Sequence, residues 1–503
     1  MGLILKRRLA LLLVLTVLAG WLRVWNIGNQ SLWFDEVFSR NVAIEPNLWA
    51  IAQNGVAGDV HPPLYFMLLN GWEHLTGQSE VALRMLSALI AMLGVPAFYH
   101  FARLLFDERV GLVALALGVI APFQVYYAQE ARQYALSITC ATWAMVGLLA
   151  LLQGKRYGWR LYVIAGVAGL YTHYFSVLML IAVHAWLVVY PPARQQWRRW
   201  LSADVLIGLL FVPQVFIFLS QTQAVFGGFW ITRPILTAPL VTLTYLLFST
   251  TLAPLPPLLA ILVEGLLIAT LAVAALDIFG KAPRKMRPYW LLCMIVLIGV
   301  LIPSLLISLV ATPIYLDRSF GMLSPFLLAA LAAAFVTARA PSPTRILIGI
   351  LAVLMCGGTI LHALTPDPAK PPYRQIAADL LNTPDAEVVP VLTLSDSAYL
   401  PLTYYAPTLE QQLVDVGEKS WLFPKTWQLF NVQRLTRDQL AEWLRTYRGK
   451  LRVIEPNTID KPELATLHDL ERNACTKTGK TYNQIVIVYE FTLGPCLAWR
   501  PPM

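Results

Sequence analysis

Two adjacent carboxylates, Asp35 and Glu36, follow a pair of aromatic residues, Trp33 and Phe34, in a segment between two long apolar runs. Aromatic rings favour the boundary between membrane and water, where one side is apolar and the other is wet. The aromatic pair would therefore hold the two acids at that boundary, where a carboxylate can acquire a pKa suited to accepting a proton. The chemistry indicated is general base catalysis, and the alternative is a pair of solvated loop acids.

An arginine in the segment 129–134 is the second candidate. Arg132 carries a planar guanidinium that fits a phosphate or a carboxylate through two parallel hydrogen bonds. If a helix begins at Glu130, then Glu130 and Tyr134 share one of its faces and Arg132 points elsewhere. The segment is expected on the same side of the membrane as Asp35, which favours ligand binding over simple solvation of a helix end.

Two further arginines, Arg318 and Arg84, would add positive charge for an anionic ligand at the same surface. Each also has a structural explanation. Arg318 follows Asp317, and an exposed pair of this kind contributes little. Arg84 lies four residues after Glu80, a spacing at which two side chains meet on a helix surface.

Two histidines complete the candidate pocket. His61 precedes two prolines in the same loop as the acid pair, and His173 lies among tyrosines at another outer turn. A lone histidine at the end of a span is more often an interfacial anchor than a catalytic group, so both histidines have this second interpretation.

The composition identifies the elements that must position these residues as membrane spans. Of 503 residues, 57% are hydrophobic and only 13% are charged, whereas a soluble globular chain carries about 25% charged residues. The formal charge of +9 fits an excess of lysine and arginine in cytoplasmic loops, and so does not require a nucleic-acid partner. The sequence contains no zinc-ligand spacing and no glycine-rich phosphate loop, which argues against a metal-centred or nucleotide-dependent soluble enzyme.

Apolar runs of about twenty residues predict about eleven spans. They lie at residues 7–25, 81–106, 110–128, 134–152, 160–173, 175–191, 201–221, 255–279, 288–310, 320–338 and 344–364. The first span is expected to be a retained signal anchor, because its apolar run is long and no clear cleavage site follows it. Residues 62–75 are predicted to form an interfacial helix and residues 49–53 another surface helix. Residues 236–252 are predicted to lie on or partly in the outer leaflet.

Lysine and arginine fall on every second loop, as the positive-inside rule requires. They are Lys6, Arg7, Arg8, Arg103, Arg109, Lys155, Arg156, Arg160, Arg194, Arg198, Arg199, Lys281, Arg284, Lys285, Arg287, Arg339 and Arg345. The predicted protein is thus a multi-pass protein of the cell membrane with a cytoplasmic N-terminus. All the candidate site residues then fall on the outer side.

The composition changes at about residue 366, where charges become frequent and apolar runs shorten to the length of strands. The sequence predicts helices at 373–381 and 437–447, with Thr436 as the N-cap of the second. Strands are predicted at 388–394, 412–416, 451–455 and 484–491, which together indicate a small extracytoplasmic α/β domain. Cys475 and Cys496 both lie in it, so a disulfide is favoured over two free thiols.

Two ionisable residues, Glu264 and His184, are placed by the predicted spans near the middle of the bilayer. Charged groups at this depth are costly and commonly functional. Neither has an obvious partner in the sequence, and neither is assigned to the candidate site.

The motifs taken together resemble glycosyltransferase family 39-like membrane proteins, relatives of the dolichyl-phosphate-mannose–protein mannosyltransferases and of the lipid A aminoarabinose transferase. The segments that carry the resemblance are Trp33-Phe34-Asp35-Glu36, Asp59-Val60-His61-Pro62-Pro63-Leu64-Tyr65, Glu80 with Arg84, Ala128-Gln129-Glu130-Ala131-Arg132-Gln133-Tyr134 and Tyr171-Thr172-His173-Tyr174. It covers about the first 360 residues and is strongest before Phe175. It implies a C-type glycosyltransferase fold at 1–365, with a first outer loop at 26–80, followed by the domain at 366–503.

The resemblance also implies an activity and its partners. A sugar would move from a polyprenyl-phosphate-linked donor to an acceptor hydroxyl on a lipid, glycan or protein. Asp35 would take the role of the catalytic acidic residue, with Glu36 beside it. Arg132 and Arg318 would bind the lipid phosphate, and Arg84 and His61 match patterned positions without a fixed role. Some C-type enzymes use a divalent metal beside their acids and others do not, and Asp35 and Glu36 alone do not decide this.

Two other functions are compatible with the sequence. A transporter or flippase for a lipid or polysaccharide would place its working charges near the middle of the bilayer, where the chain has mainly Glu264 and His184. A ligase or assembly scaffold for a surface polymer would depend more on the domain at 366–503 than on Asp35.

Overall fold

The computed structural model describes residues 2–55, 59–226, 231–253, 255–339, 341–365, 367, 370–383, 389–415, 424–456, 466–468, 470–472, 474–483 and 485–493. The chain divides into two compact units. We call Met1–Ile27, Val60–Phe226 and Ile231–Thr365 the helical unit, and Gly28–Asp59 with Pro366–Met503 the sheet unit. The loop that carries Asp35, which the sequence analysis grouped with the spans, therefore packs with the C-terminal segment.

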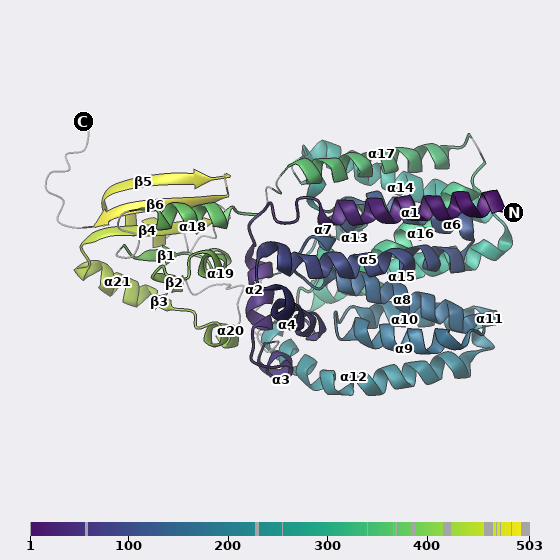
Figure 1. The fold of residues 1–503 in the computed structure, drawn as a ribbon, viewed down its shortest axis with the longest axis horizontal. Coiled ribbons are helices and arrows are strands. Elements are labelled where there is room, and N and C mark those ends of the chain that lie inside the picture. Colours follow the sequence, from purple (N-terminus) through teal and green to yellow (C-terminus); the bar gives the residue numbers. More distant parts are fainter. Residues whose placement is uncertain are drawn as a thin grey trace. The chain divides into compact units, whose positions relative to one another are not determined.

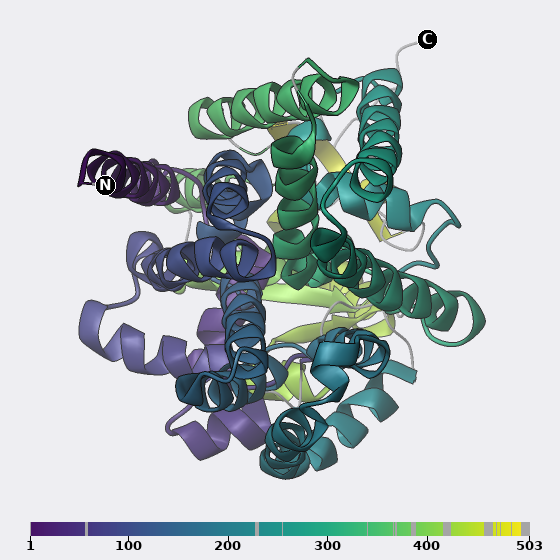
Figure 2. The same ribbon diagram turned by 90° about the vertical axis from the view of Figure 1, so that its right-hand side faces the viewer.

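The helical unit consists of helices that lie side by side (Figure 1). Figure 2 looks along them, with α1 at the edge of the bundle. They are α1 (Gly2–Val24), α4 (Leu64–Thr76), α5 (Glu80–Leu105), α6 (Glu108–Ile120), α7 (Pro122–Ala128), α8 (Tyr134–Leu152), α9 (Arg156–Leu170), α10 (Ser176–Val189), α11 (Pro191–Arg194), α12 (Trp197–Phe226), α13 (Ala238–Phe248), η3 (Ser249–Leu252), α14 (Pro257–Gly280), η4 (Arg284–Met286), α15 (Arg287–Val310), η5 (Asp317–Leu323), α16 (Ser324–Thr337) and α17 (Pro343–Leu364).

Several helices begin at residues that suit a helix start. The Ser79 hydroxyl accepts a hydrogen bond from the Ala82 N–H before α5, and the Asp107 carboxylate accepts from two backbone N–H groups before α6. Both side chains satisfy donors that the first turn leaves unpaired. Pro122 occupies the first position of α7, where a missing N–H costs nothing. It also marks a 60° bend between α6 and α7.

Within the described residues, seven helices are long and apolar enough to cross a membrane, and the bent pair α6–α7 makes an eighth. Helices α9 and α10 match predicted spans but have only 15 and 14 residues, which is about 21–23 Å at 1.5 Å per residue. The apolar stretch at 236–252 forms an 11-residue α13 followed by η3. A helix of that length reaches about 17 Å, far less than the ~30 Å hydrocarbon core. The predicted interfacial helix at 62–75 is α4.

The basic loops gather at one end of the helical unit, the end that carries the N-terminus and α11 in Figure 1. Arg8 on α1 forms an ion pair with Glu108 at the start of α6, and Arg103 lies 3.2 Å from the same carboxylate. The Gln196 amide donates to the Leu152 carbonyl, which joins the α8–α9 turn to the start of α12. These contacts bring together loops that the charge pattern assigns to one side of the membrane.

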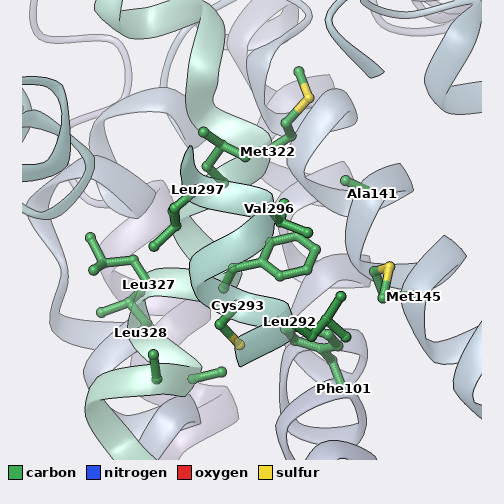
Figure 3. Close-up of a cluster of buried hydrophobic side chains, with 14 of the residues drawn as sticks. Phe101, Ala141, Met145, Leu292, Cys293, Val296, Leu297, Met322, Leu327 and Leu328 are labelled. Carbon is green, nitrogen blue, oxygen red and sulfur yellow. The ribbon is translucent and has the colours of Figure 1, made fainter. Parts of the chain in front are cut away.

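The core of the helical unit lies where α5, α8, α15 and α16 meet, as Figure 3 shows. Leu292, Cys293, Val296 and Leu297 of α15 face the side chains of the other helices, and all are buried. Helices α8 and α9 approach so closely that a Cβ on Gly147 or Gly158 would clash with the backbone of the facing helix. Close packing through glycine is typical of helix pairs in membranes.

The sheet unit contains a six-stranded sheet in the order β3-β2-β1-β4-β6-β5. Strands β1 to β4 pair in parallel, and β6 is antiparallel to both β4 and β5. The elements are α2 (Phe34–Ala43), α3 (Leu48–Ala50), η1 (Ile51–Gly55), α18 (Tyr373–Leu381), β1 (Val391–Thr393), α19 (Asp396–Tyr405), β2 (Gln411–Asp415), α20 (Pro424–Leu429), β3 (Arg434–Thr436), α21 (Arg437–Thr446), β4 (Gly449–Pro456), β5 (Ala474–Tyr482) and β6 (Val486–Leu493).

Apolar side chains cover both faces of this sheet. Helices α18 and α19 pack on one face through Ile376, Leu380 and Leu402, and α21 packs on the other through Leu440. Each helix presents an apolar stripe to the strands, and two layers around a sheet are a stable arrangement. The predicted N-cap of α21 is found, because the Thr436 hydroxyl accepts a hydrogen bond from the Gln439 N–H.

The predictions for this segment missed the helices α19 and α20 and the strands β3 and β5. The sequence of β5, from Ala474 to Tyr482, is mostly polar and contains a glycine, so it lacks the alternation that signals a strand. It is an edge strand paired only with β6, which explains why its side chains can remain exposed and polar. Cys475 on β5 is disulfide-bonded, while Cys496 lies outside the described residues.

Candidate active site

The acid pair lies in the first turn of α2. Asp35 is 5% exposed and Glu36 is fully buried, so neither is a solvated loop acid. Glu36 takes the third helical position, and its carboxylate accepts a hydrogen bond from the Trp33 N–H at 3.4 Å. This capping contact satisfies a donor at the helix start and gives Glu36 a structural role. It leaves Asp35 as the acid without a capping function.

Helix α2 is held by the C-terminal part of the sheet unit. The Leu32 N–H donates to the Tyr405 hydroxyl at 2.6 Å, and the Arg374 N–H donates to the Ser31 hydroxyl at 3.1 Å. The Arg374 guanidinium also donates to the Gly28 carbonyl at 2.9 Å. The residues before Asp35 are thus fixed by segments more than 340 positions away in the chain, a connection that the sequence pattern does not reveal.

The helical unit has its own buried polar turn, between α7 and α8. Glu130, Arg132 and Gln133 are at most 4% exposed. The Arg132 N–H donates to the Glu130 carbonyl at 2.8 Å, which folds the turn tightly. Ser87 on α5 donates to the Arg132 carbonyl at 3.4 Å, and its hydroxyl also bonds to the Tyr65 hydroxyl of α4 at 2.9 Å. Helices α4 and α5 therefore position Arg132.

Gln133 and Ser137 are polar residues that the sequence analysis did not select. Both are buried, and they lie four residues apart at the start of α8, on one face of it. Neither the Gln133 amide nor the Ser137 hydroxyl has a hydrogen-bond partner in the described part of the chain. Buried polar groups are nearly always satisfied, so these two atoms mark a place where a polar ligand would fit. The position of Gln133 within the motif 128–134 is the available signal, and Ser137 lies three residues beyond that motif.

Arg318 and Glu130 lie near one cluster of tyrosines, which includes Tyr127 and Tyr245. The hydroxyls of these two tyrosines are hydrogen-bonded to each other. The ring of Tyr134 packs against Tyr127 with centroids 4.8 Å apart. The helical unit thus gathers three of the predicted residues, Glu130, Tyr134 and Arg318, around this aromatic cluster.

The two histidines lie together. The rings of His61 and His173 are 5.4 Å apart in an edge-to-face arrangement, and His173 is 5% exposed. The His173 Nδ1 accepts a hydrogen bond from the Phe175 N–H at 3.3 Å. The loop before α4 is tied to the α9–α10 turn by the bond from the Leu64 N–H to the Tyr171 carbonyl at 3.0 Å. This pairing, which sequence spacing could not predict, favours a pocket role for both histidines over separate interfacial anchors.

Arg84 is 2% exposed on α5, and its guanidinium donates to the Ile27 carbonyl at 2.9 Å. That bond closes the end of the segment following α1 and gives Arg84 a structural function.

The groups predicted near the middle of the bilayer have different surroundings. The His184 Nε2 lies 2.7 Å from the Asp204 carboxylate of α12, which also accepts a hydrogen bond from the Tyr162 hydroxyl at 2.8 Å. The partner that the sequence did not show is therefore Asp204. Glu264 is half-buried on α14. The contact with Asp204 gives His184 a structural role, and it gives no support to a transport pathway.

No group of three or more His, Cys, Asp or Glu side chains in the described ranges is arranged to hold a metal ion. Asp35 and Glu36 are adjacent, and Glu36 already serves as a helix cap. Metal dependence therefore stays a question for experiment.

Part of the chain matches a known protein family, and its fold resembles solved structures. Residues 60–220 match the family described as dolichyl-phosphate-mannose-protein mannosyltransferase. The fold resembles ArnT from Cupriavidus metallidurans bound to undecaprenyl phosphate, at 12% identity and a TM-score of 0.59 over 97% of each chain. It also resembles the apo state of ArnT, at 14% identity and a TM-score of 0.52 over 96% of this chain and 97% of that chain. No curated protein sequence matches this chain.

The family match and the shared fold confirm the resemblance that the motifs indicated. The chain is a polytopic helical membrane protein with the C-type glycosyltransferase fold, and it is an enzyme of the glycosyltransferase class. The match covers the segments that carry His61, Arg84, Arg132 and His173.

Proposed function

We propose that this membrane glycosyltransferase moves a sugar from a polyprenyl-phosphate donor to an acceptor hydroxyl on the extracytoplasmic side of the membrane. The reaction inverts the anomeric configuration, and Asp35 is the general base. The acceptor is a hydroxyl of a lipid, a glycan or a protein. The cytoplasmic N-terminus and the outward position of the sheet unit follow from the charge pattern of the loops.

The reaction is a single displacement at the anomeric carbon. The acceptor oxygen forms a bond to that carbon while the bond to the phosphate oxygen breaks. The acceptor proton passes to the Asp35 carboxylate, and the bonding electrons leave with the polyprenyl phosphate. A carboxylate within hydrogen-bond reach of the acceptor accelerates such a step by about 10²–10⁴-fold. Because the nucleophile attacks from the face opposite the leaving group, the product is inverted.

The leaving phosphate needs positive charge more than it needs a proton. Arg132 supplies a guanidinium that matches phosphate oxygens, and Arg318 adds a second positive charge near Tyr127 and Tyr245. The Gln133 amide and the Ser137 hydroxyl, whose own bonding capacity is unused within the described residues, would donate to the sugar or the phosphate. Arg84, whose guanidinium donates to the Ile27 carbonyl, would add a further positive charge for the donor phosphate.

The observation that carries this proposal is the burial of Glu130, Arg132 and Gln133 in one turn of the helical unit. Charged and amide groups are expensive in a membrane bundle. A turn of this kind is retained when a polar ligand completes it. The resemblance of segment 128–134 to the glycosyltransferase family supports the same assignment, and ArnT, with a similar fold, binds undecaprenyl phosphate.

The test is a transfer assay with the purified full chain and radiolabelled polyprenyl-phosphate sugars. Consumption of one of these donors, with a labelled product, is the expected result. Asp35→Asn should lower the rate by at least about 10²-fold, because the amide cannot accept the proton. Glu45→Gln, a change of the same kind just after α2, is the control and should retain activity.

Two results would contradict the proposal. One is an unchanged transfer rate in Asp35→Asn that inserts in the membrane and melts as the wild type does. The other is the absence of donor consumption for every polyprenyl-phosphate sugar, together with movement of an intact lipid across the bilayer of a vesicle.

A further inference from the structure

A second polar site lies in the sheet unit, away from the acid pair on α2. It is a groove of about 480 Å³ between α18 and the strands β4, β6 and β5. Its polar lining consists of Asp379, Thr383, Arg452, Thr478, Lys480 and Glu490. The volume falls within the range of about 300–1,000 Å³ that is common for small-molecule sites. All the lining residues lie in the described part of the sheet unit.

The strand register explains how these residues meet. Arg452 pairs with Glu490, and Glu490 pairs with Thr478, so the three side chains form one row across β4, β6 and β5. In the next row, Val488 and Ile454 belong to the apolar core under Leu380 of α18. Helix α18 ends at Leu381. The polar row lines the groove, whereas the apolar rows are covered by the helix.

Arg452 is the unusual member of this row. It is 3% exposed, and its Nε lies 3.4 Å from a Glu490 oxygen. Its Nη1 atom is buried without a hydrogen-bond partner in the structure described. A buried guanidinium N–H without an acceptor is costly. An oxygen of a bound molecule would supply the acceptor that the protein does not provide.

The charges of the groove are balanced. The Asp379 carboxylate accepts from the Lys480 ammonium at 2.6 Å and from the Tyr482 hydroxyl at 2.7 Å. Glu490 faces Arg452. Among the residues that line the groove, two acids and two bases therefore compensate one another, and a ligand with a net charge would leave one of them uncompensated. The Lys450 ammonium, which is outside this lining, lies 3.8 Å from the other Glu490 oxygen. The site offers carboxylate acceptors and ammonium, guanidinium and hydroxyl donors within one groove.

We propose that this groove binds a neutral carbohydrate. Sugar hydroxyls donate to the carboxylates of Asp379 and Glu490 and accept from Lys480, Thr478 and the free Nη1 of Arg452. A groove of this volume accommodates a glycan of one or two residues. The proposal concerns binding in the sheet unit and does not depend on the role of Asp35, so glycan binding would persist in a chain that has lost transfer.

The experiment uses the full chain in lipid nanodiscs with neutral hexose disaccharides and trisaccharides as probes. Saturation-transfer NMR and titration give the affinity, and inorganic phosphate serves as the anionic comparison. Saturable binding of at least one neutral oligosaccharide is expected, with no displacement by an equal concentration of phosphate. Asp35→Asn should bind the same oligosaccharide with unchanged affinity.

A matched pair of variants on β5 locates the site. Lys480 faces the groove, whereas Lys477, on the same strand, points to the other face and lies over the Tyr489 ring at 4.0 Å. Lys480→Met should weaken oligosaccharide binding at least tenfold, and Lys477→Met less than twofold. Thr478→Trp, which fills the groove from an exposed edge strand, should abolish binding, and thermal unfolding of each variant checks its fold. If Thr478→Trp does not fold, Thr478→Val replaces it and should weaken binding.

Three results would overturn the proposal. They are the absence of saturable binding of any neutral oligosaccharide, equal affinities in Lys480→Met and Lys477→Met, and competition by phosphate at equal concentration. A transfer-active Asp35→Asn would overturn the proposed base instead, and would leave the groove measurements as they are.

Discussion

The helical unit and the sheet unit bury charged side chains in different ways. In the helical unit, Glu130 and Arg132 occupy one turn with the Gln133 amide, and each is at most 4% exposed. In the sheet unit, the Arg452 Nε lies 3.4 Å from Glu490 across the strands, while the Arg452 Nη1 has no acceptor among the described residues. The charge of Arg452 is thus balanced by a partner on a neighbouring strand, and part of its guanidinium is left for a ligand.

This difference between the two units indicates the role of the buried polar turn that contains Glu130, Arg132 and Gln133. A helix bundle in a bilayer has no water nearby to solvate a misplaced charge, so every buried polar group there carries a large cost. The Gln133 amide and the Ser137 hydroxyl have no hydrogen-bond partner among the described residues, so they bring no stability to that part of the bundle. Their retention is explained by a ligand. The following predictions test this contrast between groups kept for a ligand and groups kept for the fold.

The largest effect is expected at Arg132. Arg132→Lys keeps the charge but loses the planar pair of donors, so phosphate binding in the transition state should weaken. Removal of one such donor lowers a rate by about 10²–10³-fold. The measurement is kcat/KM for sugar transfer. Arg109→Lys, on an exposed residue at the basic end of the helical unit, is the control. A wild-type kcat/KM in Arg132→Lys would mean that positive charge alone, and not the planar guanidinium, is what the donor phosphate requires.

Gln133 separates ligand binding from stability most directly. Gln133→Leu removes an amide that has no hydrogen-bond partner among the described residues of the bundle, so the free energy of unfolding should stay the same or rise. The donor KM should rise about tenfold, the effect of one lost hydrogen bond to the ligand. Thr142→Val, on the same helix, removes a hydroxyl that donates to the Ile138 carbonyl at 2.7 Å. That control should lower stability and leave KM unchanged. A raised KM in Thr142→Val, with a stability loss in Gln133→Leu, would contradict the assignment of Gln133 to ligand binding.

Tyr405 tests the opposite case in the sheet unit, a polar group kept for the fold. Tyr405→Phe removes the hydroxyl that accepts from the Leu32 N–H, and a buried donor left without its acceptor costs about 1–3 kcal/mol. The backbone before Asp35 should then exchange its amide hydrogens faster, by mass spectrometry. Tyr404→Phe is the neighbouring control. Unchanged exchange at Leu32 would show that the segment is fixed by other contacts.

The smallest effect concerns Glu455. Burial raises the pKa of its carboxyl, and the hydrogen bond with Tyr489 partly opposes this. A folded-state pKa above the unfolded value of about 4.3 means that the folded state binds the proton more tightly. The charged form therefore lowers stability at neutral pH, and the cost disappears as pH falls through the raised pKa.

Glu455→Gln should accordingly slow hydrogen exchange in β4 slightly at pH 7, by a few-fold at most, and the difference from wild type should vanish near pH 4. Glu442→Gln, an exposed residue on α21, is the control and should show no such pH dependence. A Glu455→Gln chain that is less stable than wild type at pH 7 would mean that the Tyr489 hydrogen bond outweighs the cost of burial.

The amino-acid sequence was sufficient to predict that the chain is a membrane protein and to select the candidate site residues. Runs of apolar residues and the alternation of basic loops are patterns of the sequence itself, so they can be recognised without knowledge of how the helices pack. The same holds for the Thr436 cap, which depends on residues three apart. The motif around Asp35 and the segment 128–134 could be chosen because their charged side chains lie next to apolar spans, where such groups are costly.

The contacts between side chains far apart in the sequence could be learned only from the folded structure. The pairing of His61 with His173, the partner of His184 on α12, and the bond between Arg84 and the Ile27 carbonyl join segments far apart in the chain. The packing of the Asp35 loop with Tyr405 and Arg374 is of the same kind. No periodicity encodes such contacts, because they arise when helices and strands dock, and the side chains that then meet are set by geometry rather than by spacing along the chain.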